Sequence, residues 1–174
     1  DHREGKVFVD LLSKMTLRHQ RLALGQCSYY RAALSFMSGD LKSAYDHALL
    51  ALNTTSPLCL PFITGNIRVG LAKVLVELNE REKAQEQLSI ALEGARLIGS
   101  RTMEVHSLLT TAELLLKEGQ QQEAKAALEE GLRVARDLDY VTLDYWLRPQ
   151  VMAQLLAYAL DANIEVEYVR SIIR

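Results

Sequence analysis

The chain has 174 residues, of which 49% are hydrophobic and 24% are charged, a balance typical of a single globular domain. Its formal net charge is −2, and Lys and Arg alternate with Glu and Asp. This pattern excludes the basic face that a nucleic-acid-binding domain uses to neutralise phosphates. The most apolar stretches, residues 48–52 and 114–116, are far shorter than the roughly 20 residues that cross a bilayer.

Helix formers dominate the chain, and its nine glycines and three prolines are few. Apolar side chains at helical spacing predict paired helices, with loops at 54–61 and 139–142. Arg148 and Pro149 lie close to the first turn of the fourth pair. The expected helices, in chain order, span residues 7–15 (from an earlier repeat), 21–37, 41–53, 62–78, 80–98, 102–117, 121–138, 143–160 and 164–174.

The sequence matches itself when it is shifted by about forty residues. The shift aligns small residues in the first helix of each predicted pair and in the second. It also aligns three turn residues that can adopt the left-handed conformation at a helix end. The aligned sets are Ala32, Ala72 and Ala112; Ala44, Ala84 and Ala124; and the turn residues Gly39, Asn79 and Gly119. Small side chains let two antiparallel helices pack closely, and such pairs must stack to bury their apolar faces.

A Gly-Asp turn followed by a helix with Ala44, Ala48 and Ala51 resembles a tetratricopeptide repeat. The resemblance implies an all-α fold, a right-handed superhelical solenoid of about four antiparallel helix pairs. The unit is about forty residues rather than the usual thirty-four or so, and the usual terminal Trp and Pro are absent. The chain begins with Asp1 and ends within an amphipathic pattern. We therefore expect residues 1–174 to be a single repeat domain of a longer protein.

The long repeat is similar to that of the MalT-like, LuxR-type bacterial ATP-dependent transcriptional regulators. The C-terminal stretches LLAYAL (155–160) and IEVEYVRSIIR (164–174) resemble the end of their sensor domain. In that family a helical-repeat domain follows the ATPase and senses an inducer or partner. The resemblance implies a cytoplasmic sensor and interaction domain that does not itself contact nucleic acid or membrane.

No catalytic motif accompanies this pattern. The chain has neither a phosphate-binding Gly-x-x-x-x-Gly-Lys loop nor a Gly-x-Gly-x-x-Gly motif. His2, His19, His47 and His106 have no partner at metal-ligand spacing. Cys27 and Cys59 are far apart, as expected for free thiols in a reducing compartment. The sequence therefore predicts a non-enzymatic protein with no cofactor and no metal.

The concave groove is the expected binding surface, because the first helix of each pair lines it in such a superhelix. Tyr side chains there can stack on a ligand and also offer a hydroxyl. The predicted ligand-binding residues are Gln26, Tyr29, Tyr30, Asn66, Lys73, His106, Thr110 and Glu113. We expect Tyr140, Tyr145 and Trp146 instead to pack between the third and fourth pairs.

Two functions remain open. One is a sensor domain in which a protein or small-molecule inducer occupies the groove and changes self-association. The other is a generic adaptor that holds a peptide or a partner helix in the groove, unrelated to transcription. The residues in the chain do not distinguish them.

Overall fold

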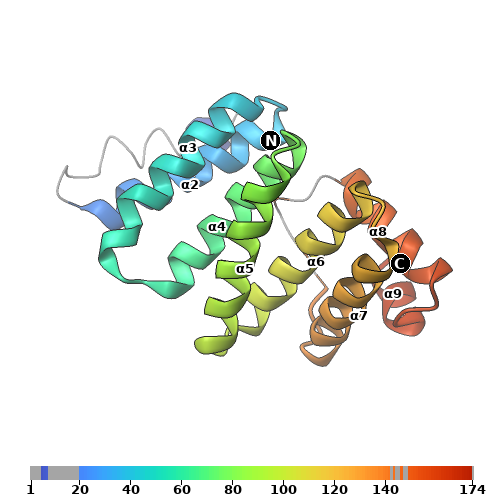
Figure 1. The fold of residues 1–174 in the computed structure, drawn as a ribbon. Coiled ribbons are helices and arrows are strands. Elements are labelled where there is room, and N and C mark those ends of the chain that lie inside the picture. The colour runs from blue at the N-terminus through green and yellow to red at the C-terminus, as the bar shows by residue number, and fades with distance from the viewer. Residues whose placement is uncertain (1–4, 8–19, 142, 144–145, 147–148, 174) are drawn as a thin grey trace.

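The protein folds into helices throughout the part of the chain that the structure describes. This computed structural model describes residues 5–7, 20–141, 143, 146 and 149–173, and these residues contain no strand. Figure 1 shows the helices following one another in pairs, from the blue end of the chain to the red end. In the described ranges, no helix has both the length and the apolar character that crossing a bilayer requires.

Eight α-helices and one short 3-10 helix fall within the described residues. They are α2 (Arg21–Met37), α3 (Leu41–Thr55), η1 (Ser56–Leu58), α4 (Pro61–Glu77), α5 (Arg81–Leu97), α6 (Arg101–Lys117), α7 (Gln121–Asp137), α8 (Pro149–Asp161) and α9 (Val166–Ile173). Seven of the predicted helices lie within two residues of these bounds. Most of the expected helix over 7–15 lies outside the described residues, although 5–7 are helical.

Two predicted boundaries were wrong. The loop expected over 54–61 is mostly helical, because α3 extends to Thr55 and η1 follows it. The helix expected from 143 begins instead at Pro149, where the fixed φ of proline suits a first helical position and its missing N–H costs nothing. Leu143 and Trp146 are outside any helix, and both are buried.

Left-handed residues end the helices, as predicted for Gly39, Asn79 and Gly119, whose φ angles are 82°, 60° and 75°. The helix-end hydrogen bonds are those of a Schellman motif. At the first turn, Asp40 N donates to the Ser35 carbonyl at 2.9 Å and Gly39 N donates to the Phe36 carbonyl at 3.0 Å. The Asp40 side chain then accepts from Ser43 N at 3.1 Å, which caps the next helix.

Each α-helix packs on the next, and α4 also contacts α2 and α6. Helices α2 and α3, α4 and α5, and α6 and α7 make the most extensive contacts. The small residues that the forty-residue shift aligns are fully buried, with 0% exposure: Ala32, Ala44, Ala72, Ala84, Ala112 and Ala124. Their lack of bulk is consistent with close helix packing.

The expected position of Trp146 was wrong. Its ring lies 5.0 Å from the Tyr29 ring and 5.9 Å from the Phe36 ring, measured between centroids. Both partners are on α2, so Trp146 belongs to the core of the first two pairs. Its chain neighbour Tyr145, grouped with it in the prediction, lies outside the described residues.

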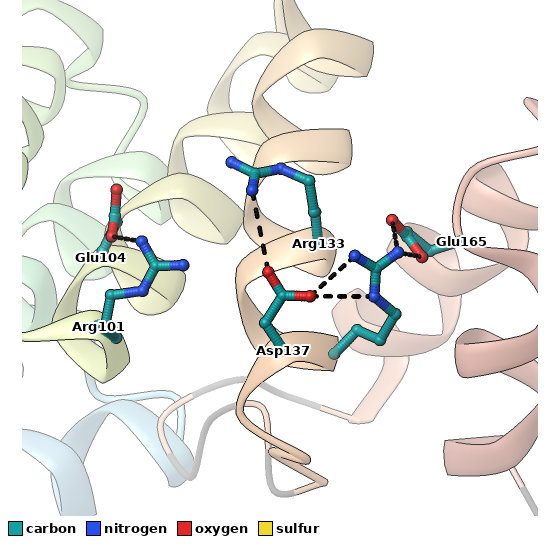
Figure 2. Close-up of polar contacts among 6 residues, drawn as sticks. Arg101, Glu104, Arg133, Asp137 and Glu165 are labelled. Atoms are coloured by element: carbon teal, nitrogen blue, oxygen red, sulfur yellow. Dashed lines mark hydrogen bonds and ion pairs between the residues drawn. The ribbon is translucent and has the colours of Figure 1, made fainter.

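Ion pairs lie within the later helices and between them (Figure 2). Glu104 faces Arg101 on α6, while Asp137 on α7 faces Arg133. Arg136 joins two elements, because its Nη1 donates to both carboxylate oxygens of Glu165 at 2.6 Å. Glu165 immediately precedes α9, so this charge-assisted contact links the end of α7 to the start of α9.

Candidate functional site

A pocket of about 280 Å³ lies where α2, α4 and α6 meet. Its walls combine aromatic and aliphatic side chains with a few neutral polar groups, a composition typical of small-molecule sites. The lining residues are Gln26, Tyr29 and Tyr30 of α2; Phe62, Ile63, Asn66 and Ile67 of α4; Thr102 and His106 of α6; and Tyr140, which follows α7.

Five of the eight predicted ligand-binding residues line this one pocket: Gln26, Tyr29, Tyr30, Asn66 and His106. Gln26, Asn66 and His106 are forty residues apart in sequence and stand on three successive first helices. Helices α2, α4 and α6 have the same length and begin forty residues apart. Equivalent positions on them therefore bring one polar side chain each to the same pocket. That these residues contact a ligand remains a prediction.

The other three predicted residues do not line the pocket. Thr110 is fully buried, and its hydroxyl donates to the His106 carbonyl at 2.8 Å. Lys73 and Glu113 are only 2% and 6% exposed. The sequence pattern placed all three on the first helices of the pairs, as observed. The periodicity of one helix does not show which neighbouring elements cover each side chain. All three are therefore buried outside the lining of this pocket, and their contact with a ligand stays a prediction.

His106 is held neutral. Burial, and then the nearby positive charge of Lys73, lower its pKa from 6.5 to about 4. Its Nε2 lies 3.1 Å from the Tyr140 hydroxyl, and the two rings are 5.8 Å apart between centroids. An uncharged imidazole can accept from that hydroxyl or donate to it. His106 therefore contributes a neutral polar edge to the pocket at physiological pH.

Two buried ionisable residues lie on helices that line the pocket, Lys73 on α4 and Glu113 on α6. Burial lowers the pKa of Lys73 to about 7, an effect that the charge of Glu113 opposes. Burial also raises the pKa of Glu113, against the opposing effect of Lys117. Lys117 Nζ bridges α4 and α6, at 3.2 Å from Glu113 and 3.1 Å from Glu77. Lys117 thus offsets the negative charges of Glu77 and Glu113 between α4 and α6.

Tyr29 has two roles in the geometry. It lines the pocket and its ring packs on the ring of Trp146, which is 1% exposed. Tyr140 and Trp146 both belong to the connection between α7 and α8, and Tyr140 lines the pocket while Trp146 packs on a lining residue.

The prediction missed five lining residues: Phe62, Ile63, Ile67, Thr102 and Tyr140. Phe62 and Thr102 precede Asn66 and His106 by one helical turn. Extending the aligned positions by four residues would have found both of them. Ile63 and Ile67 read as ordinary core residues of α4. Tyr140 has no signal in the repeat pattern, because it reaches the pocket from a connecting segment.

The described residues form no group of three His, Cys, Asp or Glu side chains that could hold a metal ion. What the pocket can do is enclose a small molecule between aromatic walls and neutral hydrogen-bonding groups. No protein-family model matches the chain, and no curated protein or solved structure matches it significantly.

Proposed function

We propose that this chain is a non-catalytic binding domain that receives a ligand in the pocket between α2, α4 and α6. The observation that carries the proposal is the convergence of Gln26, Asn66 and His106 on one cavity that is otherwise mostly apolar. Gln26 is exposed, Asn66 is half-buried and His106 is 9% exposed, so a molecule in the cavity can reach these polar groups. Polar groups placed at equivalent sites on three helices suit the orientation of a bound molecule.

The domain is, in this proposal, a right-handed tetratricopeptide-like solenoid that serves as the sensor domain of a MalT-like regulator. Support comes from the forty-residue spacing and from the resemblance of the C-terminal segment. The pocket contacts three first helices and the connection before α8, so a ligand there would bias the arrangement of these elements by its differential affinity. Changed self-association is the expected output.

The test is a thermal-shift screen of the purified domain against small metabolites and short peptides, with its oligomeric state measured in parallel. A ligand at a hundred times its dissociation constant stabilises a fold by about 2.7 kcal/mol. Tyr30→Ala removes an exposed pocket wall and should abolish the shift. Leu97→Ala, on the outer face of α5 where Leu97 is 86% exposed, should leave it unchanged.

A hit that Tyr30→Ala abolishes and Leu97→Ala preserves would support binding in the pocket. Hits unaffected by Tyr30→Ala would reject it. A peptide hit without a small-molecule hit would favour the adaptor function. A hit that leaves the oligomeric state unchanged would remove the proposed output while keeping the binding site.

A further inference from the structure

The pocket has the size of a site for one small ring compound. Its volume of about 280 Å³ is at the lower limit of the roughly 300–1,000 Å³ usual for small-molecule sites. Figure 1 shows α4 between α2 and α6, and α4 contacts both of them. A long chain or a folded partner would extend beyond this cavity, whereas a single substituted ring would fit within it.

The lack of charge in the pocket lining favours uncharged ligands over charged ones. None of the described residues that line the pocket carries a charge, and the only titratable base among them, His106, is neutral because burial depresses its pKa. Lys73 and Glu113, on the same helices, are directed into the protein interior and are buried. A charged ligand would find no counter-charge among the lining side chains. Lys73, whose charge acts on His106, is itself buried, and burial lowers its pKa to about 7.

Aromatic side chains give the pocket flat apolar walls against which a ring can pack. The Tyr29 and Tyr30 rings lie 5.8 Å apart and are tilted at 59°, and Phe62 and Tyr140 complete the aromatic lining. Aromatic rings pair favourably in such tilted or offset arrangements. Hydrogen-bonding groups are fewer: Asn66 Nδ2 already donates to the Phe62 carbonyl at 2.7 Å, which leaves the amide oxygen as an acceptor.

We propose that the ligand of this pocket is an uncharged aromatic ring compound that carries a hydrogen-bonding substituent. This inference rests on the proposed binding function and specifies its ligand. The ring lies against Tyr29 and Tyr30, and its polar substituent reaches the amides of Gln26 and Asn66. Sugars fit less well, because they present hydroxyl groups on all sides and the walls offer few partners for them.

The experiment compares four probes of similar size: benzamide, benzoate, benzylammonium and methyl glucoside. Each is titrated into the ¹⁵N-labelled domain at pH 7.5 and constant ionic strength, and dissociation constants are taken from the amide shifts. The chain has one Trp, so a single indole N–H signal reports on Trp146 behind Tyr29. Tyr30→Ala is the pocket variant, and Leu97→Ala is its control.

We expect benzamide to bind at least tenfold more tightly than the other three probes. It should shift the indole signal, and Tyr30→Ala should weaken its binding at least tenfold while Leu97→Ala does not. Equal or tighter binding of benzoate, benzylammonium or methyl glucoside would overturn the inference, as would the absence of benzamide binding. The proposed function would survive if another ligand bound and Tyr30→Ala abolished its binding, and would fail if no ligand depended on Tyr30.

Discussion

The indole of Trp146 occupies the space that a side chain at Gly70 would fill. A Cβ atom added to Gly70 would lie 2.9 Å from the Trp146 ring, closer than real Cβ contacts allow. Gly70 is in the middle of α4, where glycine destabilises a helix by about 1 kcal/mol relative to alanine. The close approach of the indole explains why a glycine is suitable at this helical position.

Gly70→Ala should therefore destabilise the protein, by about 1–3 kcal/mol, despite the better helix propensity of alanine. In a Trp146→Leu background the same change should be neutral or stabilising, because the clash is removed. Urea unfolding of the four proteins in this double-mutant cycle measures the coupling between the two positions. Additive effects would show that the indole does not contact Gly70 in solution.

Trp146 should emit at short wavelength and resist quenching by acrylamide, because its side chain is 1% exposed. Tyr29→Ala removes the ring that lies 5.0 Å from it and should increase quenching several-fold. Tyr30→Ala, at the adjacent and more exposed position, serves as the matched control and should change quenching little. Equal quenching in the wild type and in unfolded protein would contradict the buried position.

His106 should make stability depend on pH. Its folded pKa of about 4 lies below the ordinary 6.5, so the unfolded chain binds a proton before the folded protein does as pH falls. Stability should therefore decrease between pH 7 and pH 5, by roughly 2 kcal/mol from this group. His106→Gln lacks this contribution.

The measurement is the free energy of unfolding of both proteins at several pH values. The variant keeps Lys73 on α4, whose charge lowers the pKa of His106, and Glu113 on α6. The difference between the two curves therefore gives the contribution of the imidazole. Parallel curves for wild type and His106→Gln would show that His106 takes up its proton equally in both states.

Ala124→Phe should separate α7 from its partner helix, because Ala124 has 0% exposure and a benzyl group has no room there. The expected cost is about 1–3 kcal/mol or more, and Ala84→Phe on α5 should behave in the same way. Ala126→Phe is the matched control, since Ala126 is exposed on the same helix. Thermal unfolding of the three variants checks the prediction, and equal melting temperatures would refute it.

The helices were predictable because their signals are local. Gly39, Asn79 and Gly119 mark the helix ends by their backbone preference, and the positions predicted on the first helices include five of the ten residues that line the pocket. The position of a residue along a helix does not reveal which other elements cover its side chain. Lys73 and Glu113 were for this reason expected to face the groove, but both are buried. Trp146 contacts residues far away in the sequence, and no periodic pattern encodes such a contact.

The contact between Trp146 and α2 also bears on how the protein folds. In an array whose helix pairs contact only their neighbours, each pair can open independently, and folding can begin at any position. An indole from the segment between α7 and α8 that packs on Tyr29 and Phe36 connects this segment to α2, across the helices in between. This long-range contact raises the contact order, which slows folding. We expect it also to couple the unfolding of the helix pairs that lie between these residues.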